Sequence, residues 1–256
     1  MTTILNTKKT LPILFAVMFF VMVGFGIIIP VLPFYAEELG ASPTQLGLLM
    51  AAYSLMQLLF SPMWGRISDK IGRKPVIMLG ISGLAISFFL MAISTKFWML
   101  FAARIIGGFL SAANMPTVTA YVADITTDED RGKGMGIVGA AVGLGFVFGP
   151  AIGGIFSKIS LSAPFYISAI SSGITFLFVL FFLKESLQEK KEATNKPKRT
   201  SMFAALKGAI TILYFMQFFV AVSLAGLEAT FAYFAAARAG LGTVQLGYIF
   251  MIMGFA

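Results

Sequence analysis

Long apolar runs alternate along the chain with short polar breaks. A helix needs about 20 apolar residues to cross the roughly 30 Å hydrocarbon layer of a bilayer, and the runs reach that length repeatedly. They lack the period-two alternation of membrane-spanning strands. The pattern therefore predicts an all-α integral membrane protein with seven complete crossings and part of an eighth. The predicted spans are about 11 to 35, 44 to 64, 75 to 94, 98 to 122, 132 to 156, 162 to 183, 206 to 236 and 243 to the end.

One long hydrophilic insert divides these runs. The segment KESLQEKKEATNKPKRTS (184–201) follows six spans, is highly charged and has no apolar periodicity, which is typical of a cytoplasmic linker. We therefore divide the chain into a six-helix N-terminal bundle (1–183), a basic linker (184–205) and the first helices of a C-terminal bundle (206–256). Because the last apolar run reaches Ala256 without a polar flank, we expect a fragment or a truncated product.

Composition and charge support the membrane assignment. Hydrophobic residues make up 58% of the chain and charged residues 12%, and the mean hydropathy is +0.90, which excludes a soluble globule. With a cytoplasmic N-terminus, 15 of the 19 Lys and Arg residues fall in inner segments. Only Lys96, Lys158 and Arg238 fall outside, and Arg104 lies within a span. This asymmetry satisfies the positive-inside rule, so it explains the net charge of +8 without nucleic-acid binding.

The chain contains no cysteine and no histidine. Their absence removes disulfides, thiolate or imidazole metal sites and Ser-His-Asp catalysis. An intramembrane protease would need a serine with a base or two buried acids, and the spans supply only one acid. We therefore expect no enzyme activity, no cofactor and no metal.

The stretch GRISDKIGRKPVIMLG (65–80) lies between the second and third spans. Gly65 and Gly72 permit a tight turn there, and Asp69 can cap a helix or pair with Arg73. A basic loop that only fixes topology remains an alternative.

Two ionisable residues, Arg104 and Glu228, are predicted well inside the bilayer, where a charge costs about 2.5 to 3.5 kcal/mol. Such residues usually face a cavity. Burial favours the neutral form of a carboxyl group, so Glu228 could carry a proton and exchange it for a cation. The alternatives are a glutamate that only bonds a neighbouring helix and an arginine that snorkels or is structural.

A weakly polar pocket is predicted where aromatic and Met side chains share faces with polar groups. Phe25 lies near an expected helix break at Pro30 and Pro33. The residues placed in this pocket are Phe25 on the first span, Tyr53, Gln57 and Phe60 on the second, and Met115 on the fourth.

The fifth span contains GFVFGPAIGG (145–154). A proline removes a backbone hydrogen bond and flanking glycines allow close helix contact, so this segment could form a sealed outer seam. A kinked packing helix without directional meaning is the alternative.

With these motifs the chain resembles the major facilitator superfamily, whose signature loop between helices two and three has the form G-x-x-x-D-x-x-G-R-K. A second signature is LFAARIIGGFLSAA, in which Leu100, Arg104 and Gly108 match and Gly107 replaces the usual glutamine. The segment 145–154 resembles the antiporter motif of helix five. The segment GFGIIIPVLPFYAEELG and Glu228 look most like the twelve-helix bacterial multidrug:proton antiporters.

The resemblance implies a major facilitator fold and proton-coupled efflux of hydrophobic, often cationic drugs by alternating access. It implies proton coupling at Glu228 and Arg104 and drug binding in the weakly polar pocket. The implied inner gate comprises Gly65, Asp69, Gly72, Arg73, Lys74 and Asp124. The implied antiporter motif comprises Gly145, Gly149, Pro150, Gly153 and Gly154.

We expect a monomer in the bacterial cell membrane, with protons, small hydrophobic or cationic substrates and lipid as its partners. Two other functions stay open. One is proton-coupled transport of a single metabolite such as a sugar, which the fifth-span motif and the scarcity of Asn, Gln and Trp disfavour. The other is a truncated membrane fragment that transports nothing.

Overall fold

The computed structural model describes residues 7–187 and 210–255, and these ranges contain helices and no strand. The helices are α1 (Thr7–Glu38), α2 (Pro43–Ile71), α3 (Arg73–Ala92), α4 (Phe97–Ser111), α5 (Asn114–Ile125), α6 (Arg131–Phe156), α7 (Ala163–Phe182), α8 (Ile210–Ala239) and α9 (Thr243–Phe255). Seven helical segments of the described chain are long and apolar enough to cross a membrane, and α9 is a shorter apolar helix. The predicted all-α membrane architecture is therefore confirmed.

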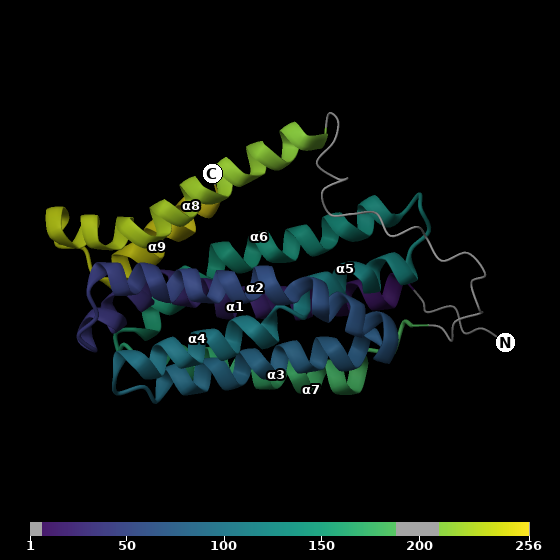
Figure 1. Ribbon diagram of the computed structural model, residues 1–256, viewed down its shortest axis with the longest axis horizontal. Coiled ribbons are helices and arrows are strands. Elements are labelled where there is room, and N and C mark those ends of the chain that lie inside the picture. Colours follow the sequence, from purple (N-terminus) through teal and green to yellow (C-terminus); the bar gives the residue numbers. More distant parts are fainter. Residues whose placement is uncertain (1–6, 188–209, 256) are drawn as a thin grey trace.

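The helices lie roughly side by side in an elongated bundle (Figure 1). Helix α1 packs most extensively against α6, while α3 packs against α7 and α4. The main core contains Leu14 and Met18 of α1, Ile77 and Ile81 of α3, and Tyr121 of α5, all with less than 2% of the residue exposed. Large apolar side chains such as Trp98 and Phe181 are exposed on the outside, as expected of a surface that faces lipid.

The turn between the second and third spans is shorter than expected. Helix α2 continues to Ile71, so Gly72 alone links it to α3. Gly72 has a φ of 112°, a conformation that residues with a side chain rarely adopt. The prediction that Gly65 takes part in this turn is wrong, because Gly65 lies inside α2 and faces Pro116 of α5.

Two expectations about helix continuity are also wrong. Helix α1 runs without a break through Pro30 and Pro33, which is possible because neighbouring helices in a bundle can satisfy the freed backbone groups. The fourth span is divided at Ala112 and Ala113 into α4 and α5. There the Ala113 N–H bonds the Leu110 carbonyl, three residues back, so the turn tightens.

We call the end of the bundle that carries Gly72 and the start of α6 the basic end, because cations gather there, among them Arg66, Lys70, Arg73, Lys74, Arg131 and Lys133. The α8–α9 turn lies at the opposite end (Figure 1). Helix α9 packs along α6, whereas α8 diverges from α6 toward the basic end (Figure 1). Residues 212–226 of α8 are exposed, Leu227 and Glu228 are half-buried, and Ala232 is the first fully buried residue among the described side chains of this helix. The predicted linker lies outside the described residues except for its first four positions.

Candidate functional site

Glu228 is where two pockets meet. The smaller pocket is lined by Phe25, Ile28, Ile29, Leu32, Pro33, Met50, Arg104 and Glu228. The larger pocket, of about 230 Å³, is lined by Ile29, Phe146, Pro150, Leu224, Leu227, Glu228, Phe250, Met253 and Gly254. Among the described residues that line these pockets, only Arg104 and Glu228 are charged. The half-buried carboxylate of Glu228 therefore lies between the N-terminal helices and α9, in surroundings that are otherwise apolar.

Arg104 reaches the smaller pocket from α4 and is 4% exposed. Its guanidinium carbon lies 4.4 Å from the ring centroid of Tyr53, a cation–π distance. Its Nε has no hydrogen-bond partner among the described residues, and no ion pair in that part of the chain joins Arg104 to Glu228. The structure thus brings the two predicted intramembrane charges into one pocket and leaves them unpaired.

A polar network extends from Tyr53 toward the basic end. The Tyr53 and Ser111 hydroxyls lie 2.8 Å apart. The Gln57 side-chain amide donates to Tyr53 Oη at 3.0 Å and to Ser111 Oγ at 3.1 Å. Tyr53 therefore connects the cation of Arg104 with two further polar side chains, and Ser111 is a member that the predicted pocket omitted.

The predicted drug-pocket residues do not all come together. The ring of Phe25 lies 5.6 Å from that of Tyr53 and 5.7 Å from that of Phe146, measured between centroids. Phe60 instead packs edge-to-face on Phe109, in a separate apolar cluster. Met115 lies beyond the break in the fourth span, is exposed and lines neither Glu228 pocket. Sequence spacing missed this because it assumed one continuous helix.

Three of the predicted gate residues, Asp69, Arg73 and Asp124, meet at the basic end. Arg73 Nη1 lies 2.7 Å from Asp69 Oδ1, and Arg73 Nε lies 2.9 Å from Asp124 Oδ2. Arg73 Nη1 also donates to Ser68 Oγ at 2.7 Å. The arginine thereby links the end of α2 to the end of α5.

Sequence reasoning missed Glu185 at this end. Its carboxylate accepts the backbone N–H groups of Arg73 and Lys74. The available signal was an acid in a basic stretch just past an apolar span. Charge counting for topology gives such an acid no weight.

The glycines of the predicted antiporter motif lie at two helix contacts. Gly145, Gly149 and Gly153 face α1, and a Cβ added to Gly149 would lie 2.7 Å from the Gly26 Cα. Gly154 faces α9, where an added Cβ would lie 2.9 Å from the Thr243 carbonyl oxygen. The Ser157 and Thr243 hydroxyls are 2.5 Å apart nearby. Helix α6 is therefore packed closely between α1 and α9.

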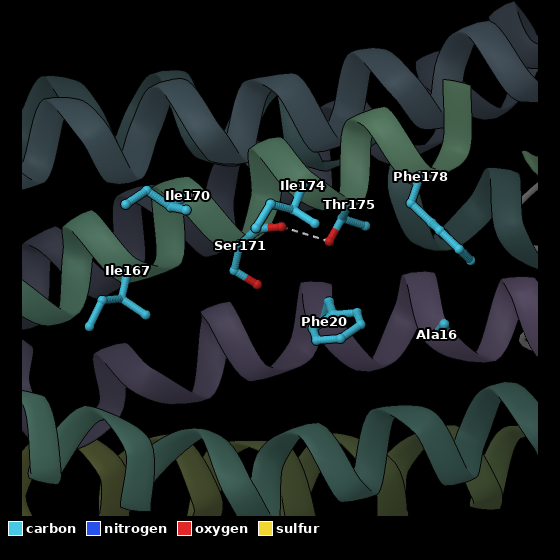
Figure 2. Close-up of a pocket in the computed structure, with 8 residues that line it drawn as sticks. All are labelled: Ala16, Phe20, Ile167, Ile170, Ser171, Ile174, Thr175 and Phe178. Carbon is cyan, nitrogen blue, oxygen red and sulfur yellow. Dashed lines mark hydrogen bonds between the residues drawn. The ribbon is translucent and has the colours of Figure 1, made fainter. Parts of the chain in front are cut away.

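A larger pocket, of about 470 Å³, lies between α1 and α7 (Figure 2). It is lined by Ala16, Phe20, Ile167, Ile170, Ser171, Ile174, Thr175 and Phe178. None of the described residues that line it is titratable, and the Thr175 hydroxyl donates to the Ser171 carbonyl within its own helix (Figure 2). Size alone therefore does not make it the functional site. No group of three metal-ligating side chains occurs in the described ranges.

Comparison with known proteins identifies similar chains. The model of a family described as Major Facilitator Superfamily matches residues 14–256. Multidrug resistance protein 2 of Bacillus subtilis is 34% identical over 255 residues, which are 97% of this chain and 64% of that protein. Tetracycline resistance protein, class D, of Salmonella ordonez is 39% identical over 212 residues, covering 81% of this chain and 53% of that protein. The chain thus spans less than two thirds of these relatives.

A solved structure supports the fold. The human organic anion transporter MFSD10 (TETRAN) superposes with a TM-score of 0.75 over 98% of this chain and 70% of that one, at 24% sequence identity.

Proposed function

Because the chain belongs to the Major Facilitator Superfamily, we propose that it is part of a transporter that exports hydrophobic, often cationic drugs in exchange for protons. The observation that carries this proposal is the position of Glu228, one carboxylate shared by two apolar pockets and unpaired with the arginine beside it. The similar multidrug and tetracycline resistance proteins support the substrate class.

The chemistry of exchange follows from a single buried acid. An ionised carboxylate in an apolar pocket is costly, and either a proton or a cationic substrate neutralises it. Binding of one therefore disfavours binding of the other, which is the requirement for antiport. Arg104 supplies a fixed positive charge in the same pocket, so it favours the ionised form that a cationic drug needs. The apolar linings of the two pockets, which include Phe25 in the smaller and Phe146 in the larger, suit a hydrophobic ligand.

Alternating access needs two ends that open in turn. Close packing of α6 against α1 and α9 supports closure of the opposite end, while the exposed first half of α8 supports an open basic end. The charge asymmetry of the loops supports a cytoplasmic basic end and N-terminus. The cluster of Arg73, Asp69 and Asp124 is then the inner gate, since charge-assisted hydrogen bonds can bias two arrangements of rigid helices by a few kcal/mol.

Dye efflux from energised membrane vesicles tests the proposal. The vesicles carry the protein expressed from its complete reading frame, and a lipophilic cationic dye is followed with and without a proton gradient. We expect gradient-dependent efflux by the wild type, a loss of more than about tenfold in Glu228→Gln, and partial activity in Glu228→Asp, which keeps the acid.

Glu129→Gln is the matched control, because it removes an exposed acid between α5 and α6. Full proton-coupled efflux by Glu228→Gln would contradict the proposal. Gradient-dependent uptake of a sugar in place of dye efflux would favour the metabolite transporter.

A further inference from the structure

The carboxylate of Glu185, three residues past the end of α7, collects four backbone N–H groups. Arg73 N–H donates to Oε1 at 2.8 Å and Lys74 N–H donates to Oε2 at 3.0 Å. The N–H groups of Ser186 and Leu187 each donate to Oε1 at 2.9 Å. This side chain therefore joins the segment after α7 to the first turn of α3.

The start of α3 requires a cap from elsewhere. Its N-cap residue is Gly72, which has no side chain to accept the free N–H groups of the first turn. An acid at a helix N-terminus also interacts favourably with the helix dipole. Glu185 supplies both the hydrogen-bond acceptor and the negative charge, although it lies 112 positions after Arg73 in the sequence. A Cβ on Gly72 would lie 2.5 Å from Glu185 Oε2, so glycine leaves the space that this carboxylate occupies.

The residues next to Glu185 in the sequence form hydrogen bonds with α5. Ser186 Oγ donates to Asp124 Oδ2 at 3.1 Å, the oxygen that also accepts from Arg73 Nε. The Tyr121 hydroxyl donates to the Lys184 carbonyl at 2.5 Å. Segment 184–187 is therefore fastened both to the start of α3 and to the last turns of α5, which are the two sides of the gate cluster.

We propose that Glu185 is a positioning residue for transport: it fixes the first turn of α3 and so places Arg73 between Asp69 and Asp124. The gate role rests on the proposed function. The alternative is that Glu185 only caps α3. In that case, loss of the cap would change neither the backbone around Asp124 nor the rate of transport.

Hydrogen exchange of the full-length protein in lipid nanodiscs tests the positioning without any need for transport. In Glu185→Gln, which keeps one acceptor but loses the charge, we expect exchange roughly tenfold faster at Arg73 and Lys74, because hydrogen bonds to charged groups are the stronger ones. We expect faster exchange also across the last turn of α5, around Asp124. Faster exchange confined to Arg73 and Lys74 would overturn the inference.

Efflux kinetics provide the second readout. We expect Glu185→Gln to lower the maximal efflux rate about tenfold, with the KM for the dye changed less than about twofold, because the Glu228 pockets do not include this end of the bundle. Glu185→Asp keeps the charge on a side chain one methylene shorter, so it should restore part of the rate and part of the exchange protection. Glu129→Gln again serves as the control of equal charge change.

The two proposals fail in different ways. A wild type without gradient-dependent efflux would contradict the proposed function, and the exchange pattern at α5 would still decide the positioning role. An active wild type with an equally active Glu185→Gln would overturn the role of Glu185 in transport and leave the proposed function standing.

Discussion

Two buried arginines of the N-terminal bundle, Arg73 and Arg104, have very different surroundings. Arg73, at the basic end, has ion pairs with Asp69 and Asp124 and a hydrogen bond to Ser68. Arg104, within the fourth span, is equally buried, but in the described part of the chain it has no ion pair, its Nε has no hydrogen-bond partner, and its guanidinium lies over the face of Tyr53.

The difference in pairing distinguishes a cluster that stabilises one conformation from a pocket that binds and releases a substrate. A buried charge without a partner is costly, so a site that keeps one has a free-energy reason to bind something else. A charge whose partners are all in place contributes to one arrangement of the helices and is lost only when that arrangement changes. By this reasoning the basic-end cluster stabilises a conformation, and the pocket of Arg104 and Glu228 binds what is transported.

The strongest test of this contrast is Arg73→Gln. The change leaves Asp69 and Asp124 without their cation, and Arg73 is buried, so we expect the free energy of unfolding to fall by about 2 kcal/mol. Unfolding of the purified protein in detergent measures it. Arg66→Gln, which removes an exposed cation from the same end, is the control. An equal effect of the two substitutions would mean that the cluster contributes little.

Arg104→Met should have little effect on stability and a large effect on efflux. Removing a buried cation relieves its desolvation cost and forfeits one cation–π contact, so we expect stability to stay within about 1 kcal/mol of the wild type. Dye efflux should nevertheless fall by more than about tenfold. A loss of stability larger than that of Arg73→Gln would show that Arg104 is a structural residue and would remove the contrast.

The smallest effect is expected at the ion pair between Asp128 and Arg131, whose atoms are 2.8 Å apart on an exposed surface. Solvent screens such a pair, so Asp128→Asn should change stability by less than about 0.5 kcal/mol and leave efflux unchanged. This variant calibrates Arg73→Gln, because the 2.8 Å pair is about as short as the Arg73 pairs, at 2.7 and 2.9 Å, and differs from them in burial. A large effect here would show that distance rather than burial determines the energy of these pairs.

Much of the fold was predictable from apolar length alone. The spans were placed to within a few residues, apart from the end of α2, because a bilayer imposes one length on every crossing helix. The motif residues Asp69 and Arg73 were also readable, since residues four apart face each other on one helical surface or across a tight turn. Where backbone geometry departed from a plain helix, prediction failed, as at Gly65 and at the break before Asn114.

Some residues of the candidate site were also predictable from the sequence, and others were not. Phe25, Tyr53 and Gln57 were placed from helical spacing, and the structure puts them in contact with one another or with Arg104. Phe60 and Met115 shared the same sequence pattern, and the structure puts them elsewhere. Whether an apolar side chain faces a pocket, a neighbouring helix or lipid depends on the rotation of its helix, which periodicity in a uniformly apolar span does not encode.

The sequence by itself determined the membrane class, the number of crossings, the family resemblance and the few charges that a bilayer would tolerate only for a reason, because each depends on composition or local spacing. Tertiary structure alone decided that Glu228 and Arg104 share a pocket without an ion pair between them, that Phe60 and Met115 lie away from that pocket, and that Glu185 caps a helix 112 positions away. These contacts depend on how rigid helices rotate and cross, and such long-range geometry leaves no periodic trace along the chain.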